Sequence, residues 1–75
     1  MPHFKDKDEK LKELGKRIKS FRKLKDLTLN ELGDKIGMDK QSVHRIEVGN
    51  HNPSYLLLSA IAEGLEISIC ELLKD

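Results

Sequence analysis

Tryptophan is absent from this 75-residue chain, and its aromatic residues are limited to Phe4, Phe21 and Tyr55. Leucine and isoleucine must therefore build any core that the chain forms. No apolar run approaches the roughly 18–20 residues that cross a membrane. The first residues, MPHFKDKDEK, also lack the apolar centre of a secretory signal. We therefore expect neither a membrane association nor export, and we expect a cytoplasmic protein.

Cysteine occurs once, as Cys70, which excludes an internal disulfide. The histidines are scattered without metal-ligand spacing, so we expect no metal and no cofactor. The sequence shows no paired carboxylates, no Ser/His/Asp or Cys/His arrangement and no phosphate loop, so we expect neither an enzyme nor a small-molecule ligand site. A chain this short forms one domain at most, stabilised by helix packing, by dimerisation or by both.

Neither sign of charge dominates the whole chain, but the charges are distributed unevenly. The 14 Lys and Arg side chains nearly balance the 13 Asp and Glu side chains. The net charge is +5 over residues 1–27, −1 over residues 28–52 and −3 over residues 53–75. A basic end beside an acidic one is typical of a nucleic-acid binder with a separate partner-facing region. A solvated lysine-rich helix face gives the same pattern, so charge alone leaves both interpretations open.

Helical periodicity runs through most of the chain. Apolar residues recur at spacings of three and four between residues 9 and 25, which predicts a first helix there. These residues are Leu11, Leu14, Ile18, Phe21 and Leu24. Residues 1–8 are charged and are expected to form a flexible tail, which leaves residues 9–75 as the domain.

The second and third helices are predicted from their ends. Thr28 and Glu31 have the Ser/Thr-x-x-Glu spacing of a capping box, in which each side chain hydrogen-bonds to the other residue's backbone. Gly37 ends this second helix, because glycine accepts the left-handed backbone that closes a helix. Asp39 is an N-cap for a third helix, which Gly49 stops in the same way.

Two more helices follow the turn cluster at residues 50–53. Ser54 is the N-cap of the fourth helix. Ser68 and Glu71 form another capping box, which opens a short fifth helix. The sequence therefore predicts an all-α fold.

The link between the second and third helices decides how they cross. Two short helices joined by Gly37-Met38-Asp39 cross near 90–120°, which is a helix-turn-helix. The outer face of the third helix then carries Lys40, Gln41, His44 and Arg45. Arginine reads guanine bidentately, glutamine reads adenine, and lysine contacts guanine or a phosphate. Any exposed helix carries such polar residues, so the spacing alone does not choose between a base-reading set and ordinary surface.

The run from Leu27 to Asp39, followed by residues 42–49 and by Asn52-Pro53-Ser54, resembles the Cro and phage-repressor (XRE-type) helix-turn-helix family. The resemblance extends from Leu14 to Leu73, and its most specific part is Arg-Ile-Glu-x-Gly at residues 45–49. It implies a five-helix, lambda-repressor-like domain whose third helix enters the major groove of double-stranded DNA. The implied function is a prokaryotic or phage transcriptional regulator, associated with the nucleoid and repressing its own gene. The alternative is a protein-interaction module of the same fold, such as an antitoxin-like partner with weak or no DNA binding.

The resemblance also assigns roles to individual residues. It places base contacts at Lys40, Gln41, His44 and Arg45. It places phosphate contacts at Thr28, Ser42, Asn50, His51 and Asn52. Arg22 and Glu47 match a structural ion pair between the first and third helices.

The chain departs from the family pattern at several positions. Leu29 stands where a phosphate-contacting glutamine is common, so that contact is missing. Gly33 replaces a small alanine and loosens the second helix by about 1 kcal/mol. Asp26 replaces a glycine at the end of the first helix. Asn50 and His51 replace basic residues, which predicts weaker phosphate binding that depends on pH, because His51 and His44 can gain a positive charge. The alternative is that both histidines are ordinary exposed polar residues.

A domain this small covers about half of a typical operator, and the family usually binds palindromic DNA as a dimer, with half-sites about 34 Å apart. The inward face of the fourth helix is already supplied by Tyr55, Leu58, Ile61, Ala62 and Leu65. The remaining apolar residues nearby are Leu56, Leu57, Ile67, Ile69 and Cys70. An exposed apolar patch of this kind marks an interface, so we expect a homodimer there. The alternative is that the long first helix covers these residues.

Overall fold

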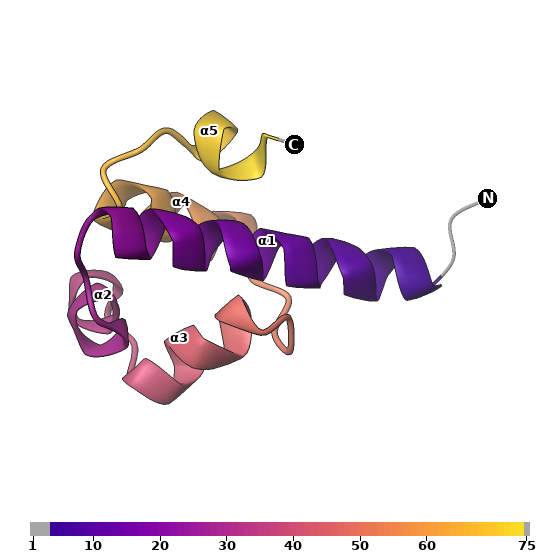
Figure 1. Cartoon of the computed structure of the whole chain (residues 1–75), viewed down its shortest axis with the longest axis horizontal. Coiled ribbons are helices and arrows are strands. Elements are labelled where there is room, and N and C mark those ends of the chain that lie inside the picture. Colours follow the sequence, from indigo (N-terminus) through magenta and orange to yellow (C-terminus); the bar gives the residue numbers. More distant parts are fainter. Residues whose placement is uncertain (1–3, 75) are drawn as a thin grey trace.

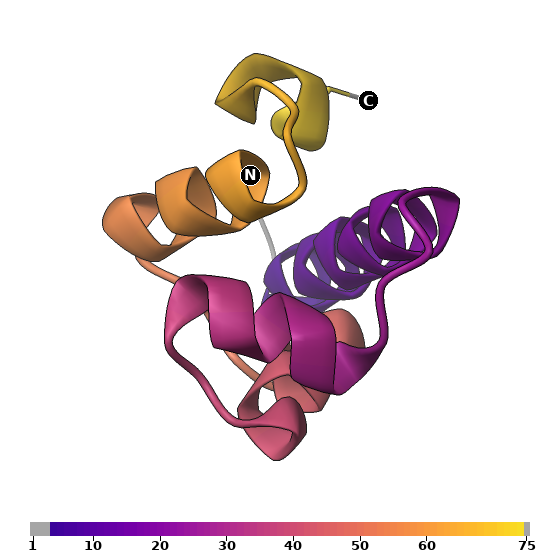
Figure 2. The ribbon, with the colours of Figure 1, turned by 90° about the vertical axis from the view of Figure 1, so that its left-hand side faces the viewer.

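The structure, a computed structural model, describes residues 4–74, which form five helices (Figure 1). The helices are α1 (Phe4–Leu24), α2 (Leu29–Ile36), α3 (Lys40–Glu47), α4 (Tyr55–Gly64) and α5 (Ile69–Leu73). The predicted all-α, five-helix class is confirmed, with the helix-turn-helix at α2 and α3. Figure 2 shows α1 and α4 on opposite sides of the molecule, with α3 at one edge and α5 at the other.

Every helix contributes to one aliphatic core. Its buried members are Ile18, Leu32, Val43, Ile46, Ile61, Ala62, Leu65 and Leu72. Phe21 packs against this cluster from α1 while remaining partly exposed. The core is therefore built by isoleucine, leucine and valine, as the shortage of aromatic residues predicts.

The first helix is longer than the sequence pattern predicts. It begins at Phe4 rather than at residue 9, so residues 4–8 of the expected tail are helical. No glycine or proline interrupts this segment. Lysine and glutamate are good helix formers, and extending an existing helix costs far less than starting one. Residues 1–3 of the expected tail lie outside the described residues.

The predicted N-caps are formed, but of the two predicted capping boxes only the one at Thr28 and Glu31 has both bonds, because no bond joins the Glu71 side chain to the Ser68 backbone. The hydroxyl of Thr28 accepts the N–H of Glu31 at 3.0 Å, and the Glu31 carboxylate accepts the N–H of Thr28 at 2.8 Å. Asp39, Ser54 and Ser68 each accept the N–H three residues further on, at 2.8, 3.1 and 3.0 Å. These bonds satisfy N–H groups that lack a partner within the helix.

Helices α1 to α4 end in similar turns, each with one left-handed residue. These residues are Asp26, Gly37, Gly49 and Glu66, with φ of 57°, 75°, 85° and 60°. After α1, the N–H of Leu27 donates to the carbonyl of Arg22 at 3.1 Å, which closes the turn. The turn is therefore retained at Asp26, where the family commonly has glycine, although a Cβ disfavours the left-handed backbone.

Gly33 is required by the turn between α2 and α3. A Cβ at this position would lie 2.3 Å from the carbonyl oxygen of Met38. The backbone of the turn therefore comes closer to α2 than an alanine permits. This close approach offsets the loss of helix propensity that glycine brings.

Replacement of Gly33 by alanine tests this contact. Although alanine is the better helix former by about 1 kcal/mol, we expect Gly33→Ala to lower the free energy of unfolding by about 1–3 kcal/mol, because the added methyl overpacks the turn. Asp34→Ala, at the next and exposed position, is the control and should leave stability unchanged or slightly raised. Urea unfolding measures both. A Gly33→Ala protein more stable than the wild type would show that the turn accommodates the methyl group.

Candidate nucleic-acid interface

The outer face of α3 carries the four side chains expected to read bases. Lys40, Gln41, His44 and Arg45 are all exposed. Val43 and Ile46, on the opposite face, are buried in the core. Because α3 lies at the edge of the fold (Figure 1), this face is open to a large partner. The structure thus brings the predicted set together on one surface.

The first turn of α3 is fixed by Asp39. Its Oδ1 accepts the N–H of Ser42 at 2.8 Å. Hydrogen bonds from the side chain and then the backbone of Ser42 lower the pKa of Asp39, and the positive charge of Arg45 adds to this effect. The carboxylate form is thereby favoured, which holds the turn bearing Lys40 and Gln41. The bond at 2.8 Å engages the backbone N–H of Ser42, a residue that was predicted to contact a phosphate.

The other predicted phosphate contacts lie at two separate places. Thr28 is exposed at the N-terminus of α2, where its hydroxyl is engaged by the capping box. Asn50, His51 and Asn52 are exposed in the loop between α3 and α4. None of these residues carries a fixed positive charge.

The predicted ion pair between α1 and α3 is formed. Nε of Arg22 lies 2.7 Å from Oε2 of Glu47, and Nη2 donates to Oε1 at 3.1 Å. Nη1 of Arg22 also donates to the carbonyl of Leu27 at 2.8 Å. The two residues are only 7% and 6% exposed. A bidentate, buried pair of this kind fixes both distance and orientation.

Glycine brings the backbones of α1 and α3 together, a contact that sequence reasoning missed. A Cβ on Gly15 would lie 2.3 Å from the carbonyl oxygen of Glu47 and 2.5 Å from that of Ile46. A Cβ on Gly49 would lie 2.8–3.0 Å from atoms of Lys12. The available signal was the position of Gly15 inside a helical pattern, since glycine there is costly unless another backbone approaches closely.

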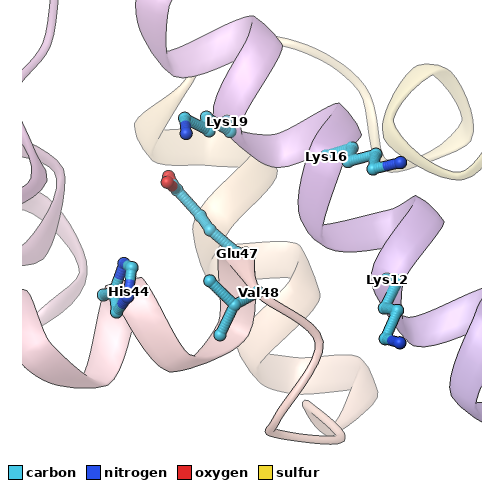
Figure 3. A pocket seen from close by; sticks show the side chains of 6 residues that line it. All are labelled: Lys12, Lys16, Lys19, His44, Glu47 and Val48. Atoms are coloured by element: carbon cyan, nitrogen blue, oxygen red, sulfur yellow. The ribbon is translucent and has the colours of Figure 1, made fainter.

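A groove beside α3 was also missed. It has a volume of about 270 Å³ and lies between α1 and α3 (Figure 3). Its lining consists of Lys12, Lys16, Lys19, His44, Glu47 and Val48. We call it the lysine groove. The sequence signal was the spacing of four and three between its lysines, within the basic first third of the chain.

The expected dimer patch is corrected in part. Leu56 is 79% exposed and Cys70 is exposed, as predicted. Leu57, Ile67 and Ile69, however, are partly buried against the core. Leu57 lies one turn before Ile61 on the same face of α4, so the inward face is wider than predicted.

Tyr55 was predicted to face inward, and this is wrong because its side chain is 66% exposed. It is the first residue of α4, whereas the buried residues of this helix, Ile61 and Ala62, lie in its later turns. Within residues 4–74, no helix is long and apolar enough for a membrane span, and no cluster of His, Cys, Asp and Glu could hold a metal ion.

A helix-turn-helix family model matches residues 18–72, which is most of the chain. The chain belongs to the XRE-type helix-turn-helix family. Its relatives include the transcriptional regulators SinR of Bacillus licheniformis and of Bacillus subtilis, each 36% identical over 63 residues. This match covers 83% of the chain but 57% of SinR, so the chain spans little more than half the length of these relatives.

Solved structures of helix-turn-helix proteins share the fold. The restriction-modification controller C.AhdI of Aeromonas hydrophila is 31% identical, with a TM-score of 0.80 over 83% of this chain and 94% of that one. The clp gene regulator ClgR of Corynebacterium glutamicum is 28% identical, with a TM-score of 0.83 over 85% and 82%. SinR in complex with SinI is 36% identical, with a TM-score of 0.76 over 83% and 61%. The predicted family and the lambda-repressor-like fold are confirmed, and the family supports the expectation that the chain is not an enzyme.

The buried pair predicts a specific pattern of stabilities. We expect Arg22→Met to lower the free energy of unfolding by about 3–5 kcal/mol, because Glu47 is left buried and unpaired. The double variant Arg22→Met/Glu47→Leu should regain much of this loss, since no buried charge remains. Urea unfolding of the wild type, both single variants and the double variant measures the coupling. If Arg22→Met is unfolded in water, recovery of cooperative unfolding in the double variant shows the same effect; additive losses would contradict it.

Proposed function

We propose that the protein is a sequence-specific, double-stranded DNA-binding transcriptional regulator that inserts α3 into the major groove. The observation that carries this proposal is the exposed set of four hydrogen-bonding side chains on one face of α3. The helix is held at its start by Asp39 and at its end by the Arg22–Glu47 pair. Membership of the helix-turn-helix family and similarity to named transcriptional regulators support the same function.

The proposed base contacts are divided by chemistry. The exposed guanidinium of Arg45 suits guanine, and the amide of Gln41 suits adenine. Lys40 and His44 complete the set. Thr28 and residues 50–52 are proposed to position the domain through phosphate oxygens. A domain bound at a promoter occludes polymerase, so we propose repression, including repression of its own gene, on the bacterial nucleoid.

A protein-interaction module is the second candidate. Leu29 gives α2 no side-chain contact to a phosphate, and the exposed leucine at position 56 suits an apolar partner. The related SinR has been solved in complex with SinI, so a relative of this chain binds another protein. DNA binding by variants of α3 separates the two candidates.

Replacement of Arg45 distinguishes the DNA-binding regulator from the protein-interaction module. The wild type is titrated at two salt concentrations with DNA from upstream of its own gene and with a scrambled duplex. We expect Arg45→Ala to weaken binding to the first duplex by about 1–3 kcal/mol while remaining folded. Binding to the scrambled duplex should change little, since nonspecific affinity comes from phosphate contacts. Lys35→Ala, an exposed cation of α2 away from the α3 face, is the control. Indifference to Arg45→Ala would favour the interaction module.

We also propose that the DNA-bound form is a homodimer joined through the exposed start of α4. Leu56 and Tyr55 are adjacent there and strongly exposed. Dimerisation would remove this apolar surface from water and would place two copies of α3 on a palindromic operator.

Sedimentation of matched variants tests the dimer. Leu56→Glu should shift the protein toward the monomer, because a carboxylate is poorly tolerated in an apolar interface. Leu24→Glu is the control, since Leu24 is 75% exposed and lies at the end of α1. Equal masses for the two folded variants would reject an interface at Leu56.

A further inference from the structure

We propose that the lysine groove binds the phosphodiester backbone of the same DNA that α3 reads. The inference rests on the proposed function and adds a second contact surface, contributed by α1. The groove lies directly beside the outer face of α3, because His44 belongs to both surfaces. The ligand is a DNA strand that borders the major groove around α3.

The cations of the groove form a ridge on α1. Lys12, Lys16 and Lys19 are separated by four and three residues, so they share one face of the helix, and all three are exposed. With a rise of about 1.5 Å per residue, the ridge is about 10 Å long. It is therefore an extended positive track that suits a polyanion better than a single small anion.

The acidic residue in the lining is neutralised. Glu47 is the one carboxylate among the lining residues. Both of its oxygens are engaged by Arg22, and its side chain is nearly inaccessible. Among the side chains that the structure describes, no ion pair engages the three lysines. The groove therefore presents a net positive charge to solvent.

The dimensions of double-stranded DNA place a sugar-phosphate strand beside this groove when α3 lies in the major groove. The major groove is about 12 Å wide, and an α-helix with its side chains is about 10–12 Å in diameter. When α3 fills the major groove, the bordering sugar-phosphate strands must pass along its flanks. One flank is the His44 side, where Lys19 extends from α1 toward α3 and Lys16 and Lys12 follow along α1 (Figure 3).

The lysine ridge also supplies positive charge that the loop after α3 and the start of α2 lack. The loop after α3, at residues 50–52, offers two asparagines and a histidine but no lysine or arginine. Position 29, at the start of α2, is a leucine. In addition to Lys40 and Arg45 on α3, the three lysines of α1 are fixed cations that can release counterions from the backbone. This arrangement assigns α1 a direct role in affinity.

The test compares two triple variants of equal net charge. Lys12→Gln/Lys16→Gln/Lys19→Gln removes the ridge. Lys10→Gln/Lys35→Gln/Lys74→Gln removes three exposed lysines that do not line the groove; on the helical wheel Lys10 lies about 160° from Lys12. Binding to the upstream and scrambled duplexes is measured over a range of salt concentrations. Circular dichroism and thermal melting verify that both variants are folded.

We expect the ridge variant to reduce the slope of log K against log salt by about 0.9 for each lysine that meets a phosphate, and therefore by about 2–3. The control should keep a slope close to that of the wild type. The preference for the upstream duplex should persist in the ridge variant, unlike in Arg45→Ala, because phosphate contacts carry no sequence information. Equal slopes for the two triple variants would overturn the inference while leaving the proposed function intact. A wild type that binds neither duplex would overturn both.

Discussion

The buried pair of Arg22 and Glu47 is the contact on which the rest of the structure depends. A carboxylate this far from water is stable only with a matched partner, and here the guanidinium satisfies both of its oxygens. The remaining donor of Arg22 reaches the carbonyl of Leu27, in the link that leads to α2. One side chain therefore joins α1, the start of the helix-turn-helix and the end of α3. The direction in which α3 faces solvent follows from this arrangement.

Much of the fold could be predicted because its signals are local. Each cap at Thr28, Asp39, Ser54 and Ser68 is a bond between residues three apart, so the sequence alone predicts where α2 to α5 begin. The burial of Ile67 and Ile69 depends instead on how α5 folds back. Arg17 of α1 donates to the carbonyls of Leu72 and Glu71 at 2.8 and 2.9 Å, contacts between residues more than fifty positions apart. Periodicity within one helix carries no information about such contacts.

The candidate site also has one part that local sequence predicts and another that depends on packing between helices. The face of α3 follows from helical spacing, since Val43 and Ile46 must point inward and Arg45 outward. For the lysine groove, helical spacing marks only a lysine-bearing face of α1, and such a face has the same sequence pattern whether it meets solvent or a neighbouring helix. The position of the groove depends on Gly15, which lets the α1 backbone approach the carbonyl oxygens at the end of α3. That approach is a property of the packed molecule.

At Gly15 the atoms of α3 that approach α1 most closely belong to the backbone, and at Gly49 the backbone of Lys12 lies nearly as close as its Cγ. Side chains can change rotamer, but two backbones at van der Waals distance cannot rotate past each other without separating the helices. Under the proposed function, α3 would therefore meet DNA in a fixed orientation, without first having to select a rare conformation. A poorly matched DNA sequence would then have to bend or twist its own duplex. Discrimination among sites would include the stiffness of base steps that the protein never touches.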